Sequence, residues 1–153
     1  MQSVFAVERL TDERASHAFP LVQASNPGIE LPAWLDFVRF HNSQFPADNS
    51  GVMAMRDSTD CFCGVFAYRI EQDVRNGRIF SIQLFVAADI MNSLSTVRAL
   101  LDAAETSASK LVCAAVQVRL SKDQAVMGSH LETLGLATDG YFAARVIQTA
   151  GLN

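Results

Sequence analysis

Basic residues are scarce in this sequence, and their scarcity argues against one class of partner. Of the 153 residues, 12 are Lys or Arg and 16 are Asp or Glu, which gives a formal net charge of −4 at pH 7. Proteins that bind nucleic acid neutralise backbone phosphates with clustered Lys and Arg side chains. We therefore expect no nucleic-acid partner.

Cysteine is also rare, with three residues in the chain. An odd and small number does not suit a disulfide framework. Cys61 and Cys63 alternate with Phe62 in an expected strand, and Cys113 falls in another. A zinc site needs four ligands, and no paired spacing of Cys or His completes such a set. We interpret Cys61 and Cys63 as core cysteines and expect no metal.

Long apolar runs are missing as well. No stretch approaches the about 18 uninterrupted apolar residues that a membrane-spanning helix needs. The N-terminal segment has no basic region followed by an apolar run, the pattern typical of a signal peptide. These absences predict no membrane partner and a cytoplasmic location.

What the sequence does contain is typical of a globular protein: 50% of its residues are hydrophobic and 18% are charged. A chain of this length suits one domain, covering residues 1–153. A domain of this size buries about 68–70% of the surface that its unfolded chain exposes, enough for a core without disulfides or metals. The apolar content is also compatible with a homodimer.

Hydrophobic periodicity divides the chain into alternating strands and helices. In chain order we expect a strand at 4–8, helices at 12–24 and 32–41, strands at 52–56, 61–70 and 78–86, a helix at 95–110, a strand at 111–120, a helix at 122–134 and a strand at 141–148. Short loops join the strands between 52 and 86, which favours an antiparallel meander. The unit at 78–120 is strand–helix–strand, which implies a right-handed crossover and a parallel pair.

Several local signals support these boundaries. Pro20 lies inside the first helix and should kink or split it. Ser121 and Gln124 have the spacing of a capping box at the start of a helix, and Gly135 is well placed to end that helix. Trp34 belongs to an aromatic stripe on the second helix, which either anchors the helix to the sheet or covers a substrate pocket. We favour the anchor, because such stripes usually face a core.

Four segments carry a similarity to a known family. They are the hairpin Val52 to Arg69 with its internal Gly64, the strand end Leu84-Phe85-Val86, the helical triplet Ala99-Leu100-Leu101, and the segment from Leu131 to Leu136. Together with the order of elements, they resemble the GCN5-related N-acetyltransferase (GNAT) family over nearly the whole chain. The resemblance implies an α/β (α+β) fold with a mixed central sheet of six to seven strands and about four helices, in the order β-α-α-β-β-β-α-β-α-β.

The resemblance also implies a cofactor, acetyl-CoA or coenzyme A (CoA), and an amine substrate, either a small molecule or a peptide. In the family, a loop with the pattern arginine or glutamine, x, x, glycine, x, glycine or alanine presents backbone N–H groups to the pyrophosphate. Aligned on Ala99-Leu100-Leu101, the expected cofactor contacts are Phe85, Val86, Asn92, Ser93, Leu94, Ser95, Thr96 and Val97.

This loop departs from the family pattern in three places. Asn92 stands where the family has arginine or glutamine, Ser95 stands where it has glycine, and Val97 stands where it has a small residue. If CoA binds here, we expect Val97→Gly to improve its binding. The alternative is that Ser93 or Ser95 simply caps a helix, a common role for serine.

Catalytic residues are not identified by the sequence. The strand at 79–86 contains no carboxylate, and its polar residues Ser81 and Gln83 are not bases near neutral pH. Leu131 occupies the position of the family's tyrosine acid. Three hypotheses follow: an acyl-CoA-dependent N-acetyltransferase, a catalytically inactive GNAT-fold binding or dimerising module, and an unrelated α+β fold. A parallel pair that splays apart around Val86 and Gln117 would exclude the third.

Overall fold

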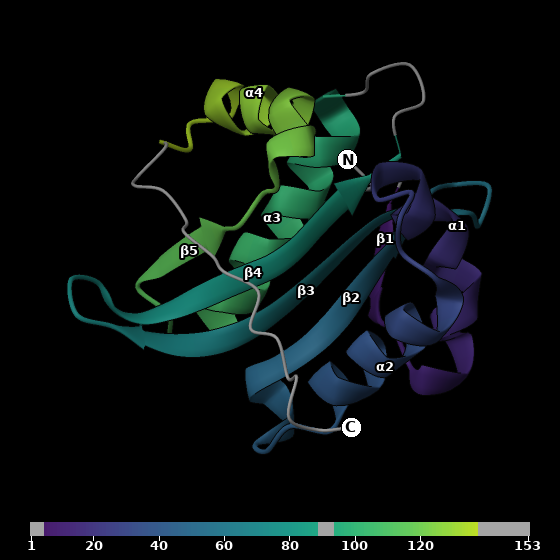
Figure 1. Cartoon of the computed structure of the whole chain (residues 1–153). Coiled ribbons are helices and arrows are strands. Elements are labelled where there is room, and N and C mark those ends of the chain that lie inside the picture. The colour runs from purple at the N-terminus through teal and green to yellow at the C-terminus, as the bar shows by residue number, and fades with distance from the viewer. Residues whose placement is uncertain (1–4, 89–93, 138–153) are drawn as a thin grey trace, which may run out of the picture.

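A computed structural model describes residues 5–88 and 94–137 of the chain. Its sheet has five strands whose spatial order follows the chain: β1 (Ala6–Arg9), β2 (Ser50–Arg56), β3 (Phe62–Asp73), β4 (Gly77–Ala87) and β5 (Ala115–Val118). Neighbouring strands are antiparallel from β1 to β4, and β5 runs parallel to β4. The predicted meander and crossover are both present (Figure 1).

Helices cover both faces of this sheet. They are α1 (Ala15–Ser25), α2 (Leu31–Asn42), α3 (Leu94–Lys110) and α4 (Ala125–Thr133), with short 3-10 turns η1 (Asp12–Arg14), η2 (Ala47–Asn49) and η3 (Lys122–Gln124). The helices α1 and α2 lie against one face, and α3 and α4 lie on the other (Figure 1). The arrangement is a three-layer α/β structure.

The core is split into two clusters by the alternation of side chains along the strands. On β3, Phe66 and Tyr68 point toward α3, where they join Leu100 and Leu131. Val65 and Ala67 point to the other face and pack with residues of α1 and α2. Trp34 of α2 is 2% exposed, and its indole N–H donates to the carbonyl of Ala15 at 2.7 Å. Trp34 therefore anchors the helix, as predicted, whereas Phe40 of the same helix and Phe45 after it are 56% and 96% exposed and do not.

The predicted order of elements agrees with the structure from β1 through α4. The described residues contain five strands, fewer than the six to seven that we expect from the whole chain. The predicted strand at 141–148 lies outside the described residues. No described helix has the length and apolarity to cross a membrane.

The predicted strand at 111–120 is shorter in the structure, where β5 begins at Ala115. Its first residues instead form the end of α3: Val112 has a φ of 59°, and the N–H of Cys113 donates to the carbonyl of Ala108 at 2.9 Å. Such a helix ending usually has glycine at the left-handed position. A valine there carries no sequence signal for a turn, so the strand was predicted too long.

Of the three predicted helix signals, the capping box and the glycine stop are confirmed, and the predicted split at Pro20 is absent. The capping box of Ser121 and Gln124 is present at the start of η3. Gly135 has a φ of 101°, and the N–H of Leu136 bonds to the carbonyl of Leu131 across it. The helix α1 continues from Ala15 to Ser25 and is not split at Pro20, whose side chain lies on the exposed side of the helix.

Candidate functional site

The strand β4 has an open edge in its second half. Pairing between β4 and β5 runs from Ile79 to Ile82, and the last backbone bond joins the N–H of Arg119 to the carbonyl of Ile82 at 2.9 Å. Beyond that point, among the residues that the structure describes, β4 is paired with β3 alone, up to Ala87. The predicted splay is therefore present, although it starts after Val118 and not at Gln117, which still pairs with Ser81. We call the unpaired edge from Gln83 to Ala87 the β4 opening.

An irregularity in the sheet marks the start of the β4 opening. Leu84 pairs with Ala67 and Ile82 pairs with Tyr68, so Gln83 is an extra residue on β4. A bulge of this kind bends a strand and changes which edge the following backbone groups face. The bulge and the end of β5 thus coincide.

A side chain already reaches into the β4 opening. The amide nitrogen Nε2 of Gln124 donates to the carbonyl of Phe85 at 3.0 Å. The other end of the same amide, Oε1, accepts the backbone N–H of Ser121 at 3.1 Å. The Gln124 side chain therefore connects the start of the α4 segment to β4. The sequence predicts the second bond through the capping box but gives no signal for the first.

The structure brings part of the predicted cofactor set to the β4 opening. Phe85 and Val86 lie along it, and both are fully buried. Leu94, Ser95, Thr96 and Val97 form the first residues of α3, which begins seven residues after β4 ends. Asn92 and Ser93 lie outside the described residues.

The side chain of Val97 belongs to the core. It is 4% exposed and packs in the cluster that contains Leu100 and Leu101. Val97→Gly therefore removes a buried side chain and should destabilise the fold. The predicted gain in CoA binding has to be measured under conditions where the variant is folded.

Comparison with known proteins finds relatives by structure and none by sequence. No protein-family model matches the chain, and no curated protein does. The glucosamine-6-phosphate N-acetyltransferase from Arabidopsis thaliana superposes with a TM-score of 0.68, covering 95% of this chain and 100% of its own, at 15% identity. The aminoglycoside N-acetyltransferase AAC(6')-Iy in complex with CoA gives a TM-score of 0.75 over 95% of this chain and 97% of its own, at 14% identity. This chain has the GNAT fold.

A third GNAT-fold structure gives the same result. The ribosomal-protein-alanine N-acetyltransferase from Brucella melitensis covers 95% of this chain and 99% of its own, with a TM-score of 0.71 at 12% identity. The predicted resemblance is confirmed at the level of the fold, and the hypothesis of an unrelated α+β fold is wrong. At identities this low, the superpositions establish the shared fold, and any chemistry has to be argued from the residues of this chain.

The polar residues of β4 are poorly suited to acid–base chemistry within this GNAT fold. Ser81 is 3% exposed and accepts a hydrogen bond from Nε2 of Gln83 at 3.1 Å. Leu131, at the position of the family tyrosine, is 4% exposed and packed in the core. A hydroxyl, an amide and an aliphatic side chain cannot abstract a proton from an ammonium group near neutral pH.

The histidines lie on helices, away from β4. His41 of α2 is 5% exposed, its Nδ1 is 3.1 Å from the carbonyl of Phe37, and its ring lies 4.4 Å from the Phe37 ring. Burial lowers the pKa of His41, the bond to the Phe37 carbonyl partly opposes that change, and the positive charge of Arg69 lowers the pKa further. His17 is exposed on α1, and His130 is half-buried on α4.

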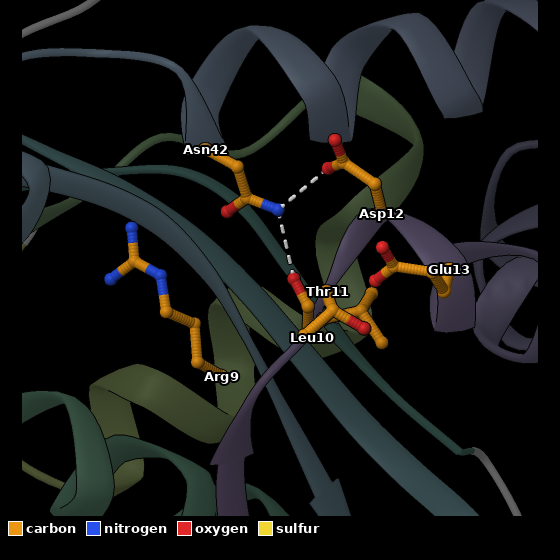
Figure 2. A pocket seen from close by; sticks show the side chains of 6 residues that line it. All are labelled: Arg9, Leu10, Thr11, Asp12, Glu13 and Asn42. Atoms are coloured by element: carbon orange, nitrogen blue, oxygen red, sulfur yellow. Dashed lines mark hydrogen bonds between the residues drawn. The ribbon is translucent and has the colours of Figure 1, made fainter.

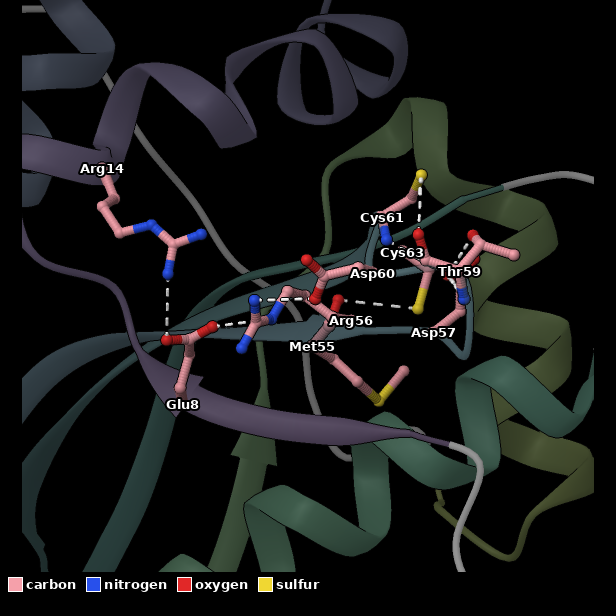
Figure 3. Close-up of polar contacts among 9 residues, drawn as sticks. All are labelled: Glu8, Arg14, Met55, Arg56, Asp57, Thr59, Asp60, Cys61 and Cys63. Carbon is pink, nitrogen blue, oxygen red and sulfur yellow. Dashed lines mark hydrogen bonds and ion pairs between the residues drawn. The ribbon is translucent and has the colours of Figure 1, made fainter.

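The two neighbouring cysteines differ in environment. Cys63 is 7% exposed, and its burial raises the pKa of the thiol to about 11. Cys61 is exposed, so its assignment to the core was wrong. The turn that precedes β3 extends through Cys61, whose carbonyl accepts the N–H of Asp57 at 2.9 Å (Figure 3). Within residues 5–88 and 94–137, no group of three or more His, Cys, Asp or Glu side chains could hold a metal.

A chain of ion pairs occupies the end of β2 nearest this turn. Glu8 lies between Arg14, at 3.3 Å, and Arg56, at 2.8 Å, and Arg56 also pairs with Asp60 at 2.8 Å (Figure 3). Partly exposed pairs of this kind contribute little stability each.

A polar hollow of about 250 Å³ lies where β1 meets the end of α2. Arg9, Leu10, Thr11, Asp12, Glu13 and Asn42 line it (Figure 2). Nδ2 of Asn42 donates to the Leu10 carbonyl at 3.0 Å and to Oδ1 of Asp12 at 2.9 Å, which ties α2 to the chain after β1. Two strands separate β1 from β4, so this hollow is distinct from the β4 opening.

Proposed function

We propose that this chain binds acetyl-CoA along the β4 opening and transfers the acetyl group to the amine of a small molecule or peptide. The observation that supports this proposal is the end of pairing between β4 and β5 after Ile82 and Val118, beyond which no described strand covers this edge of β4. An extended ligand with amide groups can bind such an edge as an additional strand does. The pantetheine arm of CoA has two amides.

The start of α3 supplies the second part of the proposed site. Backbone N–H groups at a helix N-terminus and the helix dipole both favour phosphate groups. The helix begins at Leu94, shortly beyond the end of β4, so the predicted contacts at Phe85, Val86 and residues 92–97 suit one elongated ligand. The three structural neighbours named above are all N-acetyltransferases, which supports the same class of reaction.

In the proposed reaction, the lone pair of a neutral amine attacks the thioester carbonyl carbon. The C–N bond forms, the C–S bond breaks, and CoA leaves as a thiolate while the amine releases a proton. No residue of β4 is a carboxylate, so we propose that the amine loses its proton to solvent. The rate should then rise with pH up to the pKa of the amine substrate. A plateau well below that pKa in a stopped-flow pH profile would point to a side-chain base.

The first experiment is titration of the purified protein with acetyl-CoA and with CoA, followed by thermal shift and calorimetry. A ligand at 100 times its Kd stabilises the native state by about 2.7 kcal/mol. A saturable shift supports the proposal, and release of CoA thiol with a panel of amines then tests turnover. Absence of a shift at millimolar ligand contradicts it.

A charge placed at the start of α3 tests where the phosphates bind. Ser95 is exposed in the first turn and Ser109 is exposed near the other end of the helix. Ser95→Asp should weaken CoA binding roughly ten-fold by repulsion without destabilising the helix, because acidic residues suit a helix N-terminus. Ser109→Asp is the matched control and should leave binding unchanged. Equal effects of the two variants would place the phosphates elsewhere.

A second candidate function is a GNAT-fold binding or dimerising module without catalysis. The core position of Leu131 and the absence of carboxylates in β4 favour it. Binding of acetyl-CoA without thiol release over a broad amine panel supports this candidate, and sedimentation analysis tests whether the chain forms a dimer. Turnover with any amine excludes it.

A further inference from the structure

The β4 opening already has a hydrogen-bond donor in place. In this part of the strand the carbonyl of Phe85 accepts Nε2 of Gln124 at 3.0 Å. Gln124 comes from η3, which follows β5 and precedes α4. The side chain thus occupies a position that a paired strand, or a ligand acting as one, would take.

We infer that the side chain of Gln124 acts as a plug in the β4 opening, because it occupies the carbonyl of Phe85. A ligand must displace this side chain by donating its own N–H to the same carbonyl. The inference rests on the proposed binding of CoA in this opening. It assigns to Gln124 the role of a specificity-determining residue, because displacing it leaves a buried carbonyl that needs another donor. A ligand with an amide at this point restores the bond, and a purely apolar ligand does not.

The hydrogen bonds of Gln124 explain how the plug is held. Its Oε1 accepts the backbone N–H of Ser121 at 3.1 Å, and Oγ of Ser121 lies 3.5 Å from the same oxygen. These contacts fix the amide plane from one side, so that Nε2 points at β4. The oxygen of the Gln124 amide caps the helix and its nitrogen bonds to Phe85, so a substitution can remove one contact and keep the other.

Gln124→Glu removes the plug and keeps the cap. The carboxylate still accepts the N–H of Ser121, but it has no N–H to give to Phe85. We expect CoA to bind about five-fold more tightly to this variant, the effect of one net hydrogen bond that no longer has to be broken. The uncharged Gln124→Met, which also lacks the donor, should show the same gain and excludes an effect of the added charge.

Two controls separate a plug from a general loosening of the structure. Gly135→Ala strains the backbone after α4, where φ is 101°, without touching Gln124, Ser121 or Phe85, so it should lower the melting temperature and leave CoA affinity unchanged. The nucleotide 3',5'-ADP has the adenosine, the 3'-phosphate and one of the two 5'-phosphates of CoA without the pantetheine arm, and its affinity should be the same for wild type and Gln124→Glu.

The outcomes distinguish the plug from the proposed function. Tighter CoA binding by both Gln124 variants, with unchanged 3',5'-ADP binding, supports the plug. Unchanged or weaker CoA binding by both variants, at a melting temperature close to that of wild type, overturns it and leaves the proposed function intact. Absence of CoA binding by wild type and both variants overturns the proposed function and the plug with it.

Discussion

The two halves of β4 differ in how their backbone is hydrogen-bonded, yet both contribute fully buried side chains to the core. From Ile79 to Ile82 the strand is paired on both edges, and from Gln83 to Ala87 it is paired, among the described residues, with β3 alone. Yet Phe80 in the first half and Phe85 in the second are both 0% exposed. The same strand thus combines a continuous core with an interrupted ladder of hydrogen bonds.

This comparison shows that the β4 opening is not a defect of packing. Both halves contribute buried side chains to the core, while β5 supplies backbone partners to the first half only. An opening made of backbone groups is suited to a ligand that bonds as a strand does. Substitutions that affect one half without the other test this division.

Truncation in the doubly paired half should have the largest effect. Phe80 stacks on Tyr68 with ring centroids 4.4 Å apart and lies 6.1 Å from Phe66. Phe80→Ala should lower the free energy of unfolding by about 3–5 kcal/mol, because it leaves a cavity in the core. Urea denaturation measures the loss. Phe45→Ala is the control, since Phe45 is 96% exposed and should change stability by about 0.5 kcal/mol or less.

A bulkier residue opposite the β4 opening should have an intermediate effect. Gly64 pairs with Ala87, and a Cβ atom there would lie 3.1 Å from Cδ1 of Leu100 on α3. Gly64→Val should therefore push α3 from the sheet and cost about 1–3 kcal/mol. Because α3 also starts the proposed phosphate site, CoA binding should weaken too. Gly28→Ala, with no atom within 4 Å of its Cβ, should be close to neutral in denaturation.

Relief of backbone strain at Val112, before β5, should raise the free energy of unfolding, by less than the two previous substitutions lower it. Val112 has a φ of 59° and is 80% exposed, so its side chain gains little from packing in that conformation. Val112→Gly should raise the free energy of unfolding by about 1 kcal/mol. The control is Val74→Gly, which replaces a fully exposed valine that has no positive φ. A similar gain from Val74→Gly would show that the left-handed backbone is not the cause.

Neither half of β4 contains a carboxylate or a histidine, so pH should act on stability through another element. The pKa of His41 is lowered in the folded state, chiefly by burial. Its stabilising contribution is therefore present above about pH 6.5, the usual pKa of histidine, and is lost as the pH falls from there through the folded-state pKa. His41→Gln should flatten the fall of the urea midpoint between about pH 7 and about pH 5. His17→Gln, at an exposed site, should leave that fall unchanged.

Much of this fold could be predicted from the sequence, because its determinants are local. The capping box of Ser121 and Gln124, the helix stop at Gly135 and the internal Gly64 are signals that act within a few residues. Order and spacing of the elements then sufficed to identify the GNAT fold. The expectation that the parallel pair splays came from the same order of elements.

The features that escaped prediction depend on contacts across the sheet. Gln124 was recognised as half of a capping box, but its bond to Phe85 spans 39 residues and has no local pattern. The bulge at Gln83 depends on the register between β3 and β4. Cys61 was assigned to the strand interior, since alternation alone does not show where a turn ends. The proposed site draws mainly on such distant contacts and was therefore only partly predictable.

The position of Trp34 has a practical consequence for spectroscopy. It is the chain's one tryptophan, it is 2% exposed, and it packs in the cluster formed with α1 and α2. Its fluorescence should be blue-shifted in the native state and should move to the red when α2 leaves the sheet. Because Phe85, whose carbonyl we propose as the ligand contact, belongs to the other cluster, emission from Trp34 should report unfolding with little interference from a ligand bound there.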